Sequence, residues 1–306
     1  MTQSSNNHSI SNHKSDINKG IILALIGTVL FSIKPIFIKL AYQYGGDAIS
    51  IMSLRAFSSL PIYIIMMLWL LRQPQHRYSF KRYGLSASAI GILGYYFASY
   101  LDIASMAFIS AQLERLLIFL FPSFVVLISW IVLKQKPEQG TFKAIGLGYT
   151  GVALIVFHDM SNIGNNILLG SGLAIASAFI FACYLIMSKK LITQMGSQLF
   201  TCIGMGSAGI VILLQGQWEG LSMISLDPSL VIIGIVLGIF CTVLPSFFIA
   251  AAMQKLTPSQ LSLTSNIGPA ITAIFAISIL NEPFTAFHAV GMVFVVYSVI
   301  SMKKRK

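Results

Sequence analysis

Ten runs of mostly apolar residues follow one another along the chain, and each is long enough to cross a lipid bilayer. A helix needs about 20 apolar residues to span the ~30 Å of hydrocarbon in a membrane. The runs occupy residues 20–41, 48–71, 83–103, 107–133, 141–157, 168–188, 197–215, 230–252, 258–280 and 284–302. This pattern predicts an all-α polytopic membrane protein with ten transmembrane helices.

Little of the chain is left outside these runs. Only 9% of the 306 residues are charged, against about 25% in an ordinary soluble domain. The longest loops, 73–82 and 215–228, are too short to fold as independent domains. Residues 1–19 are rich in Ser, Asn and His and are expected to be a disordered cytoplasmic tail, and residues 303–306 a short basic tail. A functional site is therefore expected between the helices.

The net charge of +11 is distributed in a way that indicates membrane orientation. Sixteen of the 20 Lys and Arg residues lie in the two tails or in alternate loops, and the intervening loops contain none. Those intervening loops carry acids instead: Asp47, Asp159, Glu219, Asp227 and Glu282. Because cytoplasmic loops are enriched in Lys and Arg, we expect both termini in the cytoplasm, which requires an even number of spans. Membrane orientation therefore explains the positive charge, which does not indicate a nucleic acid partner.

The two halves of the chain resemble each other at an offset of about 147 to 150 residues. The matched positions include Gly20 and Gly170, Lys39 and Lys189, Gly91 and Gly238, and Pro122 and Pro269. Residues 20–157 and 168–302 are therefore predicted to be two five-helix repeats. An odd number of spans per repeat makes the second repeat enter the membrane from the opposite side, an inverted plan that many secondary transporters share.

Pro122 and Pro269 stand inside the fourth and ninth apolar runs. Each removes a helical hydrogen bond and disfavours straight helix geometry. We expect both to kink their helices, as hinges or cavity walls. The simpler alternative is that prolines are common in membrane helices.

Five ionisable residues of the first half lie inside or at the end of apolar runs: Lys34, Arg55, Asp102, Glu114 and Arg115. A charge at the bilayer centre costs roughly 2.5 to 3.5 kcal/mol or more, so each one needs a partner. At 1.5 Å per residue, helix lengths place them at a similar depth, with Asp102 slightly nearer the outer surface. Glu114 and Arg115 point about 100° apart on one helix, which favours pairing of Arg115 with Asp102, and of Glu114 with Arg55 or Lys34.

Two interpretations of these charges stay open. One is a structural ion network that fixes helix packing. The other is a substrate cavity, in which three cations against two acids leave one positive charge for an anionic substrate group. Glu114, with Asp102 as second choice, is then the candidate to carry a coupling proton, because the sequence has no nucleotide-binding loop to power uphill transport. The candidate lining residues are Lys34, Arg55 and Arg115, with Ser265 and Asn266 as a neutral wall from the second half.

The sequence predicts neither a metal site nor a cofactor. Cys183, Cys202 and Cys241 lie inside spans at a spacing unlike any metal motif. His158 and His288 stand at helix ends and are interpreted as membrane-interface residues. Paired acids like those of intramembrane proteases are also missing, which disfavours an enzyme. A membrane-embedded enzyme or a lipid flippase is the alternative to a carrier.

Over residues 20–302 the sequence resembles the ten-helix EamA-type transporters of the drug/metabolite transporter superfamily. The resemblance is carried by the duplicated five-helix plan, by the two proline-containing helices and by the acid in ILNEP, Glu282. The matching segment of the first half, VLKQKP, has Gln135 in place of the acid.

The resemblance implies a carrier of the bacterial inner membrane that works by alternating access. Such carriers export amino acids, nucleobases, metabolites or toxic compounds. Export of a small polar metabolite is therefore expected. The expected partners are a small-molecule substrate and the lipid bilayer, with a homodimer left open.

Overall fold

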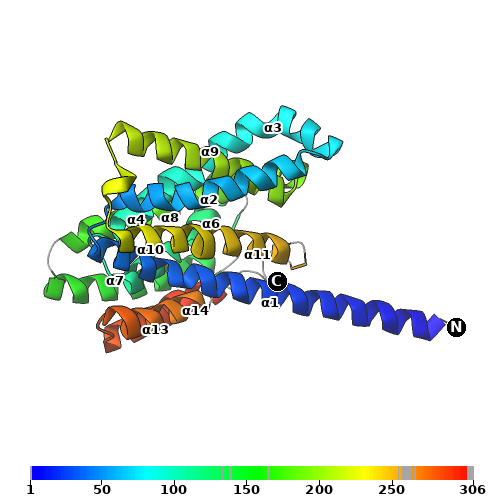
Figure 1. Cartoon of the computed structure of the whole chain (residues 1–306). Helices are drawn as coiled ribbons and strands as arrows, with labels where there is room; N and C mark the ends of the chain where they lie inside the picture. The colour runs from blue at the N-terminus through cyan, green and yellow to red at the C-terminus, as the bar shows by residue number, and fades with distance from the viewer. Residues whose placement is uncertain are drawn as a thin grey trace.

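The computed structural model describes residues 2–132, 134, 136–137, 140–163, 166–253, 255–256, 264 and 267–301, which form helices joined by short turns (Figure 1). The elements of the first half are α1 (Thr2–Gln43), α2 (Ala48–Leu70), α3 (Pro74–Ile92), η1 (Leu93–Phe97), α4 (Ala98–Ser105), α5 (Ala111–Ile118), α6 (Phe121–Ile131) and α7 (Thr141–Ile163). Those of the second half are α8 (Asn166–Met195), α9 (Ser197–Trp218), η2 (Met223–Ser225), α10 (Pro228–Gly238), η3 (Ile239–Val243), α11 (Leu244–Met253), α13 (Gly268–Leu280) and α14 (Ala286–Ser301).

Seven helical stretches among the described residues are long and apolar enough to cross a membrane. They correspond to the first, second and fourth to eighth predicted runs. Two shorter apolar helices, Gly268–Leu280 and Ala286–Ser298, correspond to the ninth and tenth. The third run is the interrupted helix formed by α3, η1 and α4. The prediction of an all-α polytopic membrane protein with ten transmembrane helices is confirmed.

Successive transmembrane helices run in opposite directions, so the turns collect at two ends of the bundle. We call the end where α2 meets α3 and α8 meets α9 the tail end. The opposite end, where α1 meets α2 and α13 meets α14, is the far end. At the far end Asp47 and Ser50 form a reciprocal capping box at the start of α2, with N–H to side-chain oxygen distances of 2.7 and 2.8 Å. Asp227 begins α10 there, and the hydrogen bond that it accepts from the Ser229 amide lowers the pKa of its carboxyl.

The first helix is longer than the sequence predicts. Composition predicts that residues 1–19 are a disordered tail, yet α1 begins at Thr2 and projects beyond the bundle (Figure 1). No proline or glycine stands between Thr2 and Lys19. Once the membrane-spanning part has formed, each further residue adds a helical hydrogen bond without a new nucleation cost, so nothing local ends the helix.

The third and eighth transmembrane helices are each interrupted by one π-helical turn. The two turns, Leu93–Phe97 and Ile239–Val243, occupy equivalent positions in the two repeats. A π turn inserts one extra residue into an α-helix, which rotates the following side chains by about 100°. In the eighth helix the Thr242 hydroxyl donates a hydrogen bond of 2.8 Å to the Leu237 carbonyl across this turn.

Helix contacts recur as symmetric pairs in the two halves. The pairs are Gly20 with Leu256 and Gly170 with Ile109; Gly91 with Gly204 and Gly238 with Ser58; and Gly151 with Gly291 and Ser298 with Ala144. In each pair, one residue of the first contact is moved forward and the other backward by 147 to 150 positions to give the second contact, to within one residue. The equivalent helices α7 and α14 touch in antiparallel order, so the two repeats are inverted with respect to each other.

Candidate functional site

The ionisable residues inside the first repeat come together around Asp102. Lys34 of α1 donates a hydrogen bond of 2.6 Å from Nζ to Asp102 Oδ2 in α4, which is also an ion pair. Asp102 and Glu114 are only 6% and 2% exposed. Asp102 precedes Ile103 and Glu114 follows Leu113, and these two neighbours belong to two separate buried apolar clusters. The charges are therefore held between apolar layers, where water screens them poorly.

The pairing of Asp102 differs from the expectation. The sequence favours Arg115 as its partner, whereas Lys34 makes the contact. The π turn η1 directly precedes α4 and turns Asp102 by about 100° relative to a regular helix. The pairing expected from charge and depth did not take this rotation into account.

Glu114 lies close enough to Asp102 for the two carboxyl groups to interact, and the charges of Arg115 and Lys34 also act on it. Two carboxylates at this distance repel each other, whereas a single shared proton forms a hydrogen bond between them. This arrangement can hold a proton inside the protein.

Several polar atoms of the cluster are buried without a hydrogen-bond partner among the described residues. They are Asp102 Oδ1, Glu114 Oε2 and Arg115 Nε; elsewhere on α5, both the oxygen and the nitrogen of the Gln112 side-chain amide are also buried without a partner among the described residues. Buried polar atoms in native proteins nearly always have a partner, so such a concentration marks a place where a ligand group or water is accommodated. Gln112, which is 2% exposed, was missed by the sequence analysis because it carries no charge.

Arg115 connects the cluster to the second repeat. Its guanidinium carbon lies 5.8 Å from the centre of the Phe119 ring, and its Nη2 lies close to Gly268, the first residue of α13. A side chain at Gly268 would crowd both Arg115 and Ser32. Glycine therefore lets the start of α13 approach the arginine.

Arg55 lies on α2 at the edge of the same group and is 8% exposed. Its strongest favourable electrostatic interaction is with Asp102. Among the described residues no carboxylate lies within ion-pairing distance of Arg55 or Arg115. The sequence leaves one positive charge without a matching acid. In the structure, buried Arg55 and half-buried Arg115 are the two cations to which this applies.

The two prolines lie in the first turn of a helix. The fourth transmembrane helix is interrupted at Phe119 and Leu120, and Pro122 lies at the beginning of α6. Pro269 lies at the equivalent place in α13. Proline is well tolerated in the first turn because its missing N–H has no partner there. Ser265 and Asn266, the expected neutral wall, lie outside the described residues.

Glu282 makes a contact between the repeats that the sequence analysis did not foresee. Its carboxylate accepts hydrogen bonds from the backbone amides of Ala111 at 2.7 Å and Gln112 at 3.2 Å, at the start of α5. Ser110 Oγ accepts a third from the Leu113 amide at 3.1 Å. The acid noted in ILNEP thus caps a helix of the other repeat, next to the ionisable cluster. The signal was an acid at a helix end, but its partner is 171 residues away.

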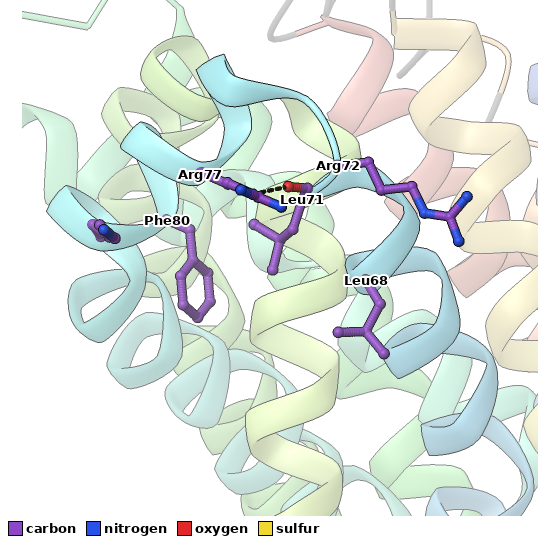
Figure 2. Close-up of a pocket in the computed structure, with 6 residues that line it drawn as sticks. Leu68, Leu71, Arg72, Arg77 and Phe80 are labelled. Atoms are coloured by element: carbon purple, nitrogen blue, oxygen red, sulfur yellow. Dashed lines mark hydrogen bonds between the residues drawn. The ribbon is translucent and has the colours of Figure 1, made fainter.

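A depression at the tail end is separate from this cluster. Figure 2 shows it between the end of α2 and the first turns of α3, lined by Leu68, Leu71, Arg72, Arg77, Phe80 and Lys81. Arg77 Nε donates a hydrogen bond of 2.7 Å to the Leu71 carbonyl, so this side chain is tied to the local backbone. The depression lies on the surface and does not reach the buried charges.

Comparison with known proteins identifies relatives over nearly the whole chain. Residues 18–157 and 168–302 each match the EamA-like transporter family. YcbK, an uncharacterized transporter of Bacillus subtilis (strain 168), is 24% identical over 94% of this chain and 93% of its own length. An uncharacterized transporter of Clostridium kluyveri is 25% identical over 95% of both chains. A solved crystal structure superposes with a TM-score of 0.64 at 14% identity, covering 94% of this chain and 96% of that one, so the fold is shared.

Proposed function

Because the chain belongs to the EamA-like transporter family, we propose that it is a secondary transporter of the bacterial inner membrane with both termini in the cytoplasm. It exports a small polar metabolite, such as an amino acid or a related compound, by alternating access. The observation that carries this proposal is the buried ionisable cluster, in which polar atoms of Asp102, Glu114 and Arg115 have no partner among the described residues. A purely structural network would satisfy its own members.

The start of α13 supports an anionic group on the substrate. The N-terminus of a helix carries a partial positive charge and free backbone N–H groups. Here it approaches Arg115, whose Nε is buried without a partner among the described residues. Interrupted helices whose N-termini point at substrate anions recur in secondary transporters. A substrate carboxylate that reached Arg115 Nε beside this helix start would interact favourably with both.

The remaining parts of the cluster supply coupling. Lys34 holds Asp102, while Glu114 contacts a carboxyl group and has one oxygen, Oε2, without a partner among the described residues. A proton on Glu114 would remove the repulsion from Asp102. Opening the cluster to one side of the membrane and then to the other would let Glu114 take up and release that proton, and so link export to the proton gradient.

Counterflow in proteoliposomes tests the carrier. Candidate compounds are those whose levels rise in a deletion strain and fall in an overproducing strain. Vesicles preloaded with an excess of one unlabelled candidate should take up the labelled compound without an added energy source and without chemical change. The methyl ester of a transported acid should compete roughly tenfold more weakly or worse, because a charge-assisted hydrogen bond is lost.

Recovery of the label in an altered compound would instead indicate an enzyme. Absence of exchange for every compound whose cellular level responds to the deletion would contradict transport. Equal competition by the acid and its ester would leave the proposal of a carrier standing but would contradict an anion site at Arg115.

A further inference from the structure

A second group of ionisable side chains lies near the far end, away from the proposed transport site. Asp159 Oδ1 lies 3.1 Å from His158 Nδ1 and 3.4 Å from His288 Nε2. One ligand atom from each of the three residues lies within 4.8 Å of the other two. Asp159 and His288 are 5% and 2% exposed, and His158 is half-buried. Two imidazoles and a carboxylate therefore converge on one small space.

These distances fit a tetrahedral metal ion. With metal–nitrogen and metal–oxygen bonds of about 2.0 to 2.2 Å, neighbouring ligand atoms of a tetrahedral zinc site are about 3.3 Å apart. The two distances from Asp159 Oδ1, 3.1 and 3.4 Å, are close to this value, and the two imidazole nitrogens lie within 4.8 Å of each other. Imidazole ligands select zinc and related transition metals over Mg²⁺ and Ca²⁺. We propose that His158, Asp159 and His288 bind one Zn²⁺ ion, with a water molecule as the fourth ligand.

The surroundings of His288 hold its ring in a suitable orientation. Thr285 holds His288 Nδ1 through two contacts, from its hydroxyl at 2.9 Å and from its backbone amide, which donates a hydrogen bond of 3.4 Å. Nε2 is therefore the ring nitrogen turned towards Asp159 and the one available to a metal ion. His158 stacks on the Phe287 ring, with 4.6 Å between ring centres, and this contact limits its rotation.

The charge of the group also favours a cation. Among the residues that the structure describes, Asp159 is within ion-pairing distance of these two histidines and of no lysine or arginine. This nearly buried carboxylate therefore has no permanently charged cation beside it among the described residues. A divalent ion supplies one. Sequence spacing does not indicate this site, because His158 and His288 stand 130 residues apart.

The ion would join the last helices of the two repeats. His158 and Asp159 lie on α7, and His288 lies on α14. Farther along, α7 and α14 pack closely through Gly151 and Gly291, and the Ser298 hydroxyl donates a hydrogen bond of 2.5 Å to the Ala144 carbonyl. The metal would hold the far ends of two helices that already touch along their length.

Metal titration of the full-length protein, purified in detergent without a histidine tag, tests the site. His8 and His13 are first replaced by Gln so that tail imidazoles do not bind the ion. Equilibrium dialysis with elemental analysis should then give one Zn²⁺ per chain in excess Mg²⁺. Co²⁺ should give the visible absorption of a tetrahedral complex. His158→Gln, Asp159→Asn and His288→Gln should each weaken binding at least tenfold, and His158→Cys should retain it because thiolate is also a zinc ligand.

His76→Gln is the matched control, because His76 lies at the tail end, and it should leave binding unchanged. Zinc that stays bound to the triple variant, or no zinc on the starting protein, would overturn the proposal. Size-exclusion profiles show which variants fold. If a Gln or Asn variant aggregates, the Co²⁺ spectrum of the starting protein decides: a tetrahedral band supports the site and an octahedral spectrum contradicts it.

Discussion

Asp102 and Glu114 lie in the same buried space but differ in their partners, and this difference separates their roles. Asp102 is bonded to Lys34 at 2.6 Å, whereas Glu114 contacts Asp102 and keeps one oxygen unpaired among the described residues. Removing one partner of a buried ion pair costs about 3 to 5 kcal/mol, because the other charge stays buried. Asp102 is therefore suited to hold the helices together, and Glu114 to change its protonation state.

Replacing Glu114 by Gln should uncouple transport from the proton gradient. The amide has nearly the same shape as the carboxyl group but cannot release a proton. The variant should therefore equilibrate substrate across the membrane without accumulating it against a gradient, while exchange at zero gradient should persist. The measurement compares proton-driven accumulation and counterflow in the same proteoliposomes. Asp102→Asn is the contrasting variant, and it should lower the folded amount of protein because Lys34 loses its charged partner. Normal pH-dependent accumulation by Glu114→Gln would show that the Glu114–Asp102 contact is structural.

Arg55 and Arg115 should matter more for transport than for folding. Neither has a carboxylate within ion-pairing distance among the described residues, so neutralising either removes no ion pair. We expect Arg115→Gln and Arg55→Gln to lower the exchange rate roughly tenfold or more, the loss of one charge-assisted hydrogen bond. Arg115→Lys should restore little, because lysine cannot offer two parallel donors. The control is Arg82→Gln, which changes an exposed arginine at the tail end. Equal losses of rate and membrane abundance would favour a structural network.

At the residue scale the sequence identifies the charges but not their contacts. A charge inside an apolar run is costly, so Lys34, Arg55, Glu114 and Arg115 are visible as exceptions. The partner of Asp102 was predicted wrongly because the pairing was chosen from charge and helix depth, which leave the direction of each side chain open. Gln112 and the His158–Asp159–His288 group depend on helices far apart in the chain, and spacing alone does not bring them together.

Among the helices, α5 is the element that links the two repeats at the proposed site. It is short, Ala111–Ile118, and it carries Gln112, Glu114 and Arg115 on fewer than three turns. An isolated helix of this length is marginal. Its first three backbone amides are bonded to Glu282 and Ser110, so its start is fixed from the opposite repeat.

Removing this cap should destabilise the protein. Loss of a helix cap costs about 0.5 to 2 kcal/mol, so Glu282→Ala should lower the melting temperature measurably, and Glu282→Gln should lower it less because one acceptor oxygen remains. Thermal unfolding in detergent, followed by size exclusion, gives the comparison. Glu219→Gln is the control, since Glu219 is exposed and accepts a hydrogen bond only from Gln215 among the described residues. Equal melting temperatures for Glu282→Ala and Glu219→Gln would show that the cap contributes nothing to stability.

Element positions follow from the sequence better than element interruptions do. Hydropathy located the spans because each must cover the same thickness of hydrocarbon. The two π turns were not predicted, because nothing in the local composition marks them. The interruption at Phe119 and Leu120 lies directly before Pro122, the residue expected to kink this helix. In the structure α1 also continues through the polar residues before the first span, since a polar segment without glycine or proline can continue an existing helix.

For the whole molecule, the inverted repeat determines where function can lie. The symmetric contact pairs relate each helix of one repeat to its equivalent in the other, and the family match covers both repeats in turn. Two similar halves of opposite orientation can exchange inward-open and outward-open shapes with little net change in packing energy. The charges, however, lie in the first repeat, so the two walls of the proposed cavity differ chemically.

The orientation of this repeat pair in the membrane can be tested by cysteine labelling. Because Lys and Arg gather at the tail end and acids at the far end, the positive-inside rule places the far end outside the cell. In a background with Cys183, Cys202 and Cys241 replaced by Ala, Gln217→Cys at the far end should react with an impermeant thiol reagent on intact cells. Arg77→Cys at the tail end should react only after the cells are permeabilised. Both side chains are exposed, so burial does not explain a difference. Labelling of Arg77→Cys on intact cells would show that the orientation is the reverse of the proposed one. The proposed zinc site would then lie on the cytoplasmic side, and the two sides to which the carboxyl pair opens would be exchanged.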